Sequence, residues 1–146
     1  MYKKVVVGTD GSPTADKAVK EAAAVARSLG AELHVVTAVR APRVSVGSAT
    51  GAPIIDTGMG QAMAEGAAQT VGEKAIEAYG EGLKAEAHAM QGNPDDVILN
   101  VAADLGADLI VVGSKGMRGA RRYLGSVPNS VAHGAHCAVL IVKTDD

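Results

Sequence analysis

Two short stretches of the sequence hold residues whose types and spacing could bind a phosphorylated ligand. The stretch VVVGTDG places Thr9 and Asp10 directly after an apolar run and Gly8. A second stretch, VVGSKGMRGARRYLGSVPNS over residues 111–130, combines four glycines and four cations with Ser126 and contains no acidic residue. Glycines let backbone N–H groups approach an anion, and the amino end of a helix favours negative charge. The second stretch therefore indicates a phosphate site at a strand-to-helix turn.

Asp10 adds a different chemistry, because a carboxylate is not a phosphate ligand by itself. At a strand end it is better suited to accept hydrogen bonds from ribose hydroxyls, or to hold a metal ion such as Mg²⁺ bound to the phosphates. Together the two stretches indicate a nucleotide more than a bare phosphate. The alternative is that the glycines only serve the turn and the cations are only solvated. The whole arrangement favours the site, with Lys115 the cation best suited to contact phosphate.

Apolar runs and helix punctuation predict the elements that position these residues. The consecutive Val5–Val7, typical of a strand buried on both faces, begin an alternation of strands and helices. The predicted fold class is α/β: an open, doubly wound, mostly parallel five-stranded Rossmann-like sheet of order 3-2-1-4-5, with helices on both faces and a single domain over 1–146. The further strands are expected at 31–40, 83–90, 108–113 and 137–143, and the helices at 13–29, 61–79, 94–105 and from near Val127, with a long loop at 41–60.

Helical spacing also predicts which side chains are buried. The first helix is expected to bury Ala15, Val19, Ala22, Val25 or Ala26, and Leu29; the second is expected to bury Met63, Ala67, Val71, Ala75 and Tyr79. In this strand order the first and fourth strands are neighbours. Thr9 and Asp10 would then face Gly113 and Gly116 across one crevice, at the carboxyl ends of the strands.

Composition excludes several classes of protein. A net charge of -2 and a pI near 6.1 give no general attraction for nucleic acid, and an aromatic content of 2% leaves little for stacking bases. No apolar run approaches the length of a membrane span and no signal peptide is evident, so we expect neither membrane insertion nor secretion. The one cysteine, Cys137, cannot form an internal disulfide. A cytoplasmic protein is expected.

Sharper catalytic and metal motifs are absent. The sequence has no Walker loop, no G-x-G-x-x-G with a downstream acid and no G-x-S-x-G elbow. The HGAHC run, with His133, His136 and Cys137, lacks a second ligand pair, and Cys137 is more simply a small buried side chain. His34 and His88 are interpreted as partly exposed strand histidines.

The sequence resembles the universal stress protein family, in its small, single-domain, nucleotide-binding form. The resemblance rests on VVVGTDGSPTADKAV, GNPDDVILNVAADLGADLIVVGSKG and LGSVPNSVAHGAHCAVLIVKT, which cover nearly the whole chain. Nucleotide-binding members carry G-x2-G-x9-G-[ST]. Here Gly113, Gly116, Gly125 and Ser126 match the residue types, with eight residues instead of nine between Gly116 and Gly125. Gly119 lies inside that interval, and its backbone freedom could compensate for the missing residue.

The resemblance implies a role for each matching position. Asp10 would contact ribose or metal-bound phosphates, while Gly8, Thr9 and the backbone near Ala38 would line an adenine pocket. Val112 and Gly113 would flank the nucleotide, and the phosphates would be held by Gly116, Gly125, Ser126 and Val127. The resemblance also implies a homodimer formed through the last strand, at residues 139–143, whose apolar edge would otherwise invite uncontrolled pairing.

The implied function is an ATP-binding stress-response or signalling module whose nucleotide state changes dimer or partner surfaces. A slow ATPase or autophosphorylating enzyme is one alternative. Hydrolysis requires a metal, a positioned water and usually a base, and the sequence places no acid or glutamine besides Asp10 near the phosphates. Binding is therefore favoured over turnover. A family member that binds no nucleotide and acts by protein contacts is the other alternative.

Overall fold

The computed structural model of the chain describes residues 2–40, 59–114 and 125–144. Strands and helices alternate along the described residues: β1 (Lys4–Gly8), α1 (Pro13–Leu29), β2 (Glu32–Val39), α2 (Met59–Tyr79), β3 (Ala85–Gln91), α3 (Pro94–Leu105), β4 (Leu109–Gly113), α4 (Ser126–Gly134) and β5 (Ala138–Val142). The strands form one sheet in the order β3-β2-β1-β4-β5. The predicted fold class and strand order are confirmed, and every strand pair is parallel.

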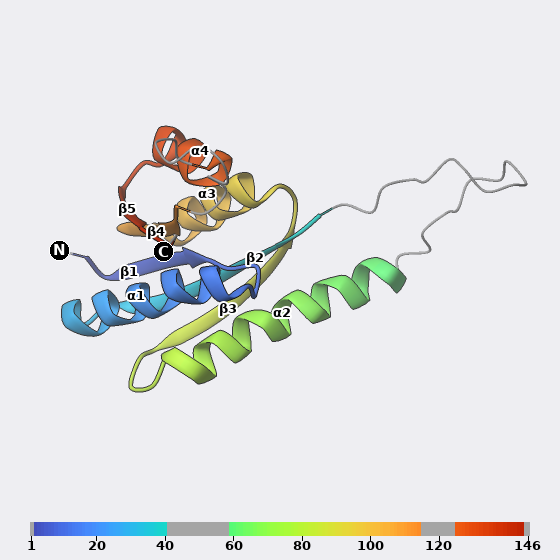
Figure 1. Ribbon diagram of the computed structural model, residues 1–146, viewed down its shortest axis with the longest axis horizontal. Coiled ribbons are helices and arrows are strands. Elements are labelled where there is room, and N and C mark those ends of the chain that lie inside the picture. The colour runs from blue at the N-terminus through green and yellow to red at the C-terminus, as the bar shows by residue number, and fades with distance from the viewer. Residues whose placement is uncertain (1, 41–58, 115–124, 145–146) are drawn as a thin grey trace, which may run out of the picture.

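The sheet is covered on both faces (Figure 1). Val5 and Val7 pack with α1 and α2, whereas Val6 packs with α3 and α4 on the opposite face. All three valines of β1 are completely buried. Side chains alternate between the faces of a strand, so a run of three valines suits a strand that is covered on both sides. This central strand places its carboxyl end, with Thr9 and Asp10, between the two helical layers.

Helix punctuation acts as the sequence predicts at α1. Ser12 Oγ accepts a hydrogen bond from the Ala15 N–H at 3.2 Å, Pro13 occupies the first turn, and Gly30 ends the helix with φ +64°. At α3, Asn93 and Gly106 take the same positions, but the Asn93 side chain makes no capping hydrogen bond. Observed and predicted ends of the elements differ by two residues at most, as where α2 begins at Met59 instead of 61.

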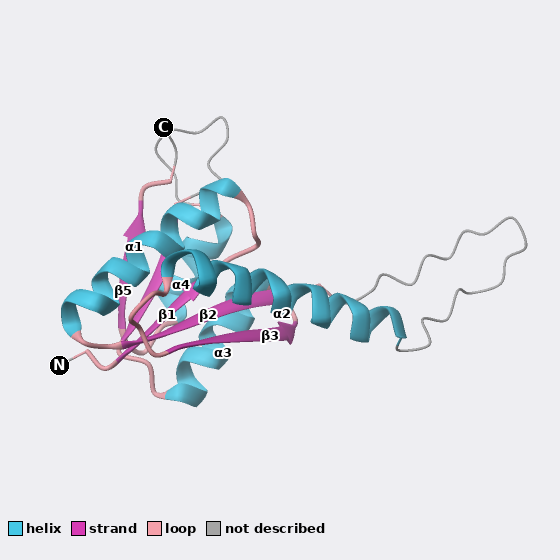
Figure 2. Cartoon of the chain, turned by 90° about the horizontal axis from the view of Figure 1, so that it is seen from below, coloured by secondary structure: helices cyan, strands magenta, loops and turns pink. Residues whose placement is uncertain are grey.

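The predicted buried face of α2 is partly wrong. Met63 is 73% exposed and Ala67 is exposed, whereas Ala68, Gly72 and Ala75 are buried. The amino-terminal part of α2 extends past the sheet in both Figure 1 and Figure 2, so nothing in the described chain covers Met63. Closer to β3, the helix turns one of its glycines, Gly72, toward the sheet. A Cβ atom on Gly72 would lie 2.9 Å from the Cβ of Ala87.

One other expectation about burial needs correction. Leu29, in the last turn of α1, is 40% exposed although Ala26 is completely buried, so the buried stripe ends before the helix does. The predicted loop at 41–60 overlaps α2 by its last two positions, while residues 41–58 lie outside the described part.

No helix among the described residues is long and apolar enough to cross a membrane.

Candidate functional site

A cavity of about 260 Å³ lies at the carboxyl ends of β1, β2 and β4. Small-molecule sites typically enclose roughly 300–1,000 Å³, so this cavity is close to the lower end of that range. It sits where the winding of the sheet reverses, because β1 pairs with β2 on one side and β4 on the other. Its lining comprises Gly8, Thr9, Asp10, Ser12, Thr14, Ala15, Ala18, Val36, Ala38, Arg40, Pro94, Ile98, Val112, Gly113, Val127, Pro128 and Thr144.

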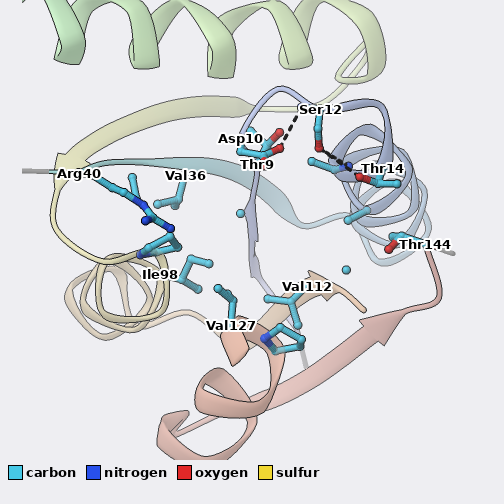
Figure 3. Close-up of a pocket in the computed structure, with 17 residues that line it drawn as sticks. Thr9, Asp10, Ser12, Thr14, Val36, Arg40, Ile98, Val112, Val127 and Thr144 are labelled. Atoms are coloured by element: carbon cyan, nitrogen blue, oxygen red, sulfur yellow. Dashed lines mark hydrogen bonds between the residues drawn. The ribbon is translucent and has the colours of Figure 1, made fainter. Parts of the chain in front are cut away.

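The turn between β1 and α1 presents the polar groups of this cavity (Figure 3). Asp10 Oδ1 accepts a hydrogen bond from the Ser12 N–H at 2.9 Å, and Thr9 Oγ1 accepts one from the Gly11 N–H at 3.1 Å. Gly11 has φ +81°, a conformation that suits glycine. The buried Thr9 is anchored further by its N–H, which donates to the Val36 carbonyl at 2.9 Å. The turn therefore orients the Asp10 carboxylate through the Ser12 N–H.

Apolar side chains form the opposite wall. Val36, Ile98, Val112 and Val127 come from four different elements and surround the cavity in Figure 3. A flat apolar group such as a nucleobase would fit such a wall, while sugar hydroxyls would suit the polar turn. Arg40, which follows β2 and is exposed, adds a cation at the rim.

The amino ends of α1, α3 and α4 all contribute residues to the lining. The positive ends of α1 and α3 are partly offset by acidic side chains in their first turns, Asp16 in α1 and Asp95 with Asp96 in α3. The first turn of α4 carries no acidic residue. Because a helix amino end attracts anions, α4 is the part of the lining best suited to a phosphate.

Glycines at the ends of β1 and β4 are required by packing. A Cβ atom on Gly8 would lie 2.6 Å from Ile98 Cδ1, and one on Gly113 would lie 2.9 Å from Thr144 Cγ2. Both glycines line the cavity, as predicted. Their small size lets Ile98 of α3 and Thr144 of the segment after β5 come close to the strand ends.

Thr144 supplies a buried polar atom next to the cavity. The residue is 1% exposed, its N–H donates to Ser114 Oγ at 3.1 Å, and its Oγ1 has no hydrogen-bond partner among the described residues. Buried hydroxyls nearly always have a partner in folded proteins. An unsatisfied hydroxyl at the wall of a cavity is a group that a polar ligand or a water molecule could satisfy.

Most of the predicted site residues converge on this cavity. The lining contains Gly8, Thr9, Asp10, Ala38, Val112, Gly113 and Val127. Gly125, which caps α4, and Ser126, its first residue, are adjacent to the lining without being part of it. Lys115 and Gly116 lie outside the described residues, and so does most of the glycine-rich stretch.

Several lining residues were missed by the sequence reasoning. By sequence, Ser12 is a helix cap before Pro13, and a cap of α1 necessarily lies at the carboxyl end of β1. Ile98 has the pattern of a core position, and Arg40 only ends an apolar run. Thr144 follows β5, and the pairing of β5 with β4 brings it beside Gly113. That pairing would have been a usable signal, since the strand order was already predicted.

Cys137 behaves as the core residue that the sequence suggested. It is half-buried and packs against the apolar cluster beneath α3 and α4, while His133 and His136 are exposed. Burial, with a smaller contribution from the negative charge of Asp108, raises the pKa of the Cys137 thiol. A raised pKa disfavours the thiolate, which is the form that binds metals and reacts with electrophiles.

The sheet order defines a Rossmann-like α/β protein, with a cavity at the switch point between β1 and β4. The family model described as the universal stress protein family matches residues 1–143, and the chain belongs to this family. Universal stress protein YxiE of Bacillus subtilis is 36% identical over 151 residues, which cover 98% of this chain and 100% of that protein.

Two similar solved structures contain nucleotides. A universal stress protein in complex with cAMP is 31% identical, with a TM-score of 0.67 and coverage of 99% of this chain and 98% of that one. The universal stress protein from Archaeoglobus fulgidus in complex with dAMP is 25% identical, with a TM-score of 0.59 and coverage of 97% and 98%. Related chains of this fold therefore bind adenine nucleotides.

Proposed function

We propose that this chain binds an adenine nucleotide, with ATP as the expected ligand, in the cavity between β1 and β4. The observation that carries the proposal is the pairing of a fixed Asp10 carboxylate with an apolar wall and with an α4 amino end that has no acidic residue in its first turn. The cAMP and dAMP complexes of related proteins support the same ligand class.

The lining suggests how the parts of the nucleotide are divided. The base lies against Val36, Ala38 and Ile98, the ribose hydroxyls donate to Asp10, and the phosphates point toward Val127 and the start of α4. Gly125 and Ser126 join the phosphate side as the cap and first residue of α4. Lys115 and Gly116 keep their proposed phosphate roles, which rest on the sequence.

In this arrangement a magnesium ion would bind only together with the phosphates of the nucleotide. Mg²⁺ is usually held by one or two carboxylates together with phosphate oxygens and water, and among the described residues Asp10 is the single carboxylate in the lining. That described lining holds no second acid or histidine to act as a base. We therefore propose a binding module whose nucleotide state alters dimer or partner surfaces, and we favour it over a hydrolase.

Isothermal titration calorimetry with ATP, AMP and cyclic AMP tests the ligand class and the role of Asp10. Asp10→Ala should weaken ATP binding about 10- to 100-fold, as expected when a hydrogen bond to a charged group is lost. Asp104→Ala is the matched control, because Asp104 is exposed near the carboxyl end of α3 and is not part of the lining, to which α3 contributes Pro94 and Ile98. The wild-type chain binding none of the three nucleotides, or Asp10→Ala binding them unchanged, would contradict the proposal.

We also propose a homodimer through β5. This strand pairs only with β4 among the described strands and leaves one apolar edge, with Val139, Leu140, Ile141 and Val142 partly exposed. Unpaired apolar edges are normally covered. A second copy of the same edge would cover it.

A further inference from the structure

Two Glu-x-His pairs lie side by side on neighbouring strands, outside the nucleotide cavity. β2 begins with Glu32, Leu33 and His34, and β3 contains Glu86, Ala87 and His88. In the parallel register His34 is opposite Glu86, and Val36 is opposite His88. Because alternate residues share a face, all four polar side chains are on the side of the sheet that carries α3.

The two imidazoles contact each other directly. His34 Nδ1 lies 3.0 Å from His88 Nε2, and the ring centroids are 5.2 Å apart. A carboxylate oxygen of Glu86 completes the cluster: one ligand atom from each of His34, Glu86 and His88 lies within 4.8 Å of the other two. Nitrogen and carboxylate oxygen are the ligands that Zn²⁺ and related transition metals prefer.

Glu32 fixes the orientation of His34. His34 Nε2 lies 3.1 Å from Glu32 Oε2, and the other carboxylate oxygen lies 3.1 Å from Lys84 Nζ. Glu32 is thereby placed to accept the His34 Nε2 proton, while Lys84 balances its negative charge. His34 then keeps its Nδ1 lone pair toward His88. A carboxylate that orients a histidine in this way is the usual outer partner of a metal-binding histidine.

The burial of the cluster is graded from the core to solvent. His34 is 4% exposed, His88 is half-buried and Glu86 is exposed. The arrangement gives a buried inner ligand and an accessible outer ligand.

We propose that His34 Nδ1, His88 Nε2 and the Glu86 carboxylate form a binding site for a transition-metal ion of the Zn²⁺ type, with Glu32 as a positioning residue. Two nitrogens bound tetrahedrally at about 2.0–2.1 Å lie about 3.3 Å apart. The two histidine nitrogens lie 3.0 Å apart, so a small increase in the distance between them would admit the ion. Three protein ligands leave a fourth position for water or another donor.

A plain hydrogen bond between the histidines is the competing explanation. In that case His88 Nε2–H donates to His34 Nδ1 and no ion is bound. Metal binding instead requires His88 to carry its proton on Nδ1 and present the Nε2 lone pair. The two explanations differ in whether the purified chain takes up one equivalent of metal.

The metal site is distinct from the nucleotide cavity. Val36, which lines the cavity, lies two residues beyond His34 along β2, and none of the four cluster residues is in the lining. Loss of the metal should therefore leave nucleotide affinity unchanged, so the two proposals can fail independently.

The test uses the full chain with any affinity tag removed, after chelator treatment and buffer exchange. Titration with ZnCl₂ by calorimetry should give one saturable site per chain. Titration with Co²⁺ should produce the visible absorption bands of a tetrahedral ion at the same stoichiometry. No saturable Zn²⁺ binding would overturn the proposal.

Variants locate the site. His88→Gln and Glu86→Gln should each weaken Zn²⁺ binding at least about 100-fold, which is beyond the 10- to 100-fold typical of outer partners. His133→Gln and His136→Gln are matched controls on exposed histidines, and they should bind Zn²⁺ like the wild type. If the controls lose binding and His88→Gln retains it, the ion is bound near Cys137 and the proposal is wrong.

Glu32→Gln tests the positioning role. It should weaken Zn²⁺ binding about 10- to 100-fold, and the ¹⁵N chemical shifts of the His34 imidazole should show a loss of the Nε2–H tautomer. Unchanged affinity together with an unchanged tautomer would remove Glu32 from the site. His34 itself is left intact, because its burial makes a folding defect the first effect of replacing it.

Discussion

At the scale of single residues, the shape of the cavity depends on how closely side chains approach the ends of β1 and β4. Gly8 leaves room for Ile98 and Gly113 leaves room for Thr144. The sequence suggested Gly8 and Gly113 for contact with a nucleotide, and both do line the cavity. Their immediate requirement, however, is packing against the helical layer and the segment after β5. Ligand binding and close packing therefore both require glycine at these positions.

Gly8→Ala should destabilise the fold by about 1–3 kcal/mol, because the new Cβ would meet Ile98 Cδ1 at 2.6 Å. Ile98→Val removes that Cδ1 atom and by itself costs about 0.5–1.5 kcal/mol. The double variant should cost less than the sum of the two, as measured by urea unfolding monitored by circular dichroism.

Gly66→Ala is the control for this cycle. Gly66 lies in α2, and a Cβ there would meet nothing within 4 Å, so alanine should stabilise the chain by about 0.5–1 kcal/mol. Strictly additive costs in the Gly8→Ala and Ile98→Val double variant would show that the close contact carries no strain.

At the scale of elements, two helices begin with similar sequences but are capped differently. Ser12 accepts a hydrogen bond from the Ala15 N–H, whereas Asn93 occupies the corresponding position of α3 without a side-chain hydrogen bond. Both positions precede a proline, so both helix starts could be predicted from the sequence. The hydrogen bond itself depends on the side-chain rotamer and on its neighbours, which the sequence does not specify.

Ser12→Ala should therefore cost about 1 kcal/mol of unfolding free energy, while Asn93→Ala should cost clearly less. Thermal and urea unfolding of the two variants give the comparison directly. Equal losses would mean that Asn93 caps α3 in solution as well as Ser12 caps α1.

Asp108 joins β1 to β4 at the ends of the strands away from the cavity. Its Oδ2 accepts hydrogen bonds from the Lys3 N–H at 2.7 Å and the Lys4 N–H at 3.0 Å. These hydrogen bonds, that from Lys3 most strongly, lower the pKa of the Asp108 carboxyl below its ordinary value. A group with a lowered pKa in the folded state binds protons more readily when unfolded, so its contribution to stability is lost as the pH falls.

The stability difference between the wild type and Asp108→Asn should be constant above about pH 5 and should shrink as the pH falls below about 4, the ordinary pKa of aspartate, and through the lowered value. Urea unfolding at a series of pH values measures it. Asp104→Asn removes a similar charge from the exposed side of α3 without removing these hydrogen bonds. A difference that persists to the lowest pH would show that the carboxylate form of Asp108 does not stabilise the sheet.

At the scale of the whole molecule, the sheet has two edges of different character. β3 forms one edge and carries polar side chains such as Glu86 and Gln91, which discourage pairing with another sheet. β5 forms the other and is apolar from Ala138 to Val142. The proposed dimer uses the β5 edge, and the single domain over 1–146 remains a proposal of the same kind.

Sedimentation velocity should give twice the 14.7 kDa mass of the chain. Ile141→Lys should give a monomer, because a two-fold axis through β5 brings the two lysines together. Leu29→Lys makes the same kind of change on the exposed end of α1 and should leave the dimer intact. Circular dichroism checks that both variants fold, and Ala138→Lys on the exposed start of β5 replaces Ile141→Lys if that variant unfolds. A monomeric wild-type chain would contradict the dimer.

The amino-acid sequence by itself determined the order of the elements, the strand order and the ends of β1 and β4 as the place of the cavity. These features follow from local signals, since apolar runs, prolines and glycines act within a few residues and parallel topology then leaves few arrangements. Seven of the predicted site residues are in the lining for this reason.

Only the tertiary structure decided which residues from distant segments meet. The exposure of Met63 depends on how far α2 extends past the sheet, and the place of Thr144 depends on the pairing of β5 with β4. The contact of His34 with His88 depends on the register of β2 and β3. His34 is 4% exposed, so its interpretation as a partly exposed histidine is wrong. A shift of one residue would move His88 to the opposite face, and no local signal in either strand fixes that register.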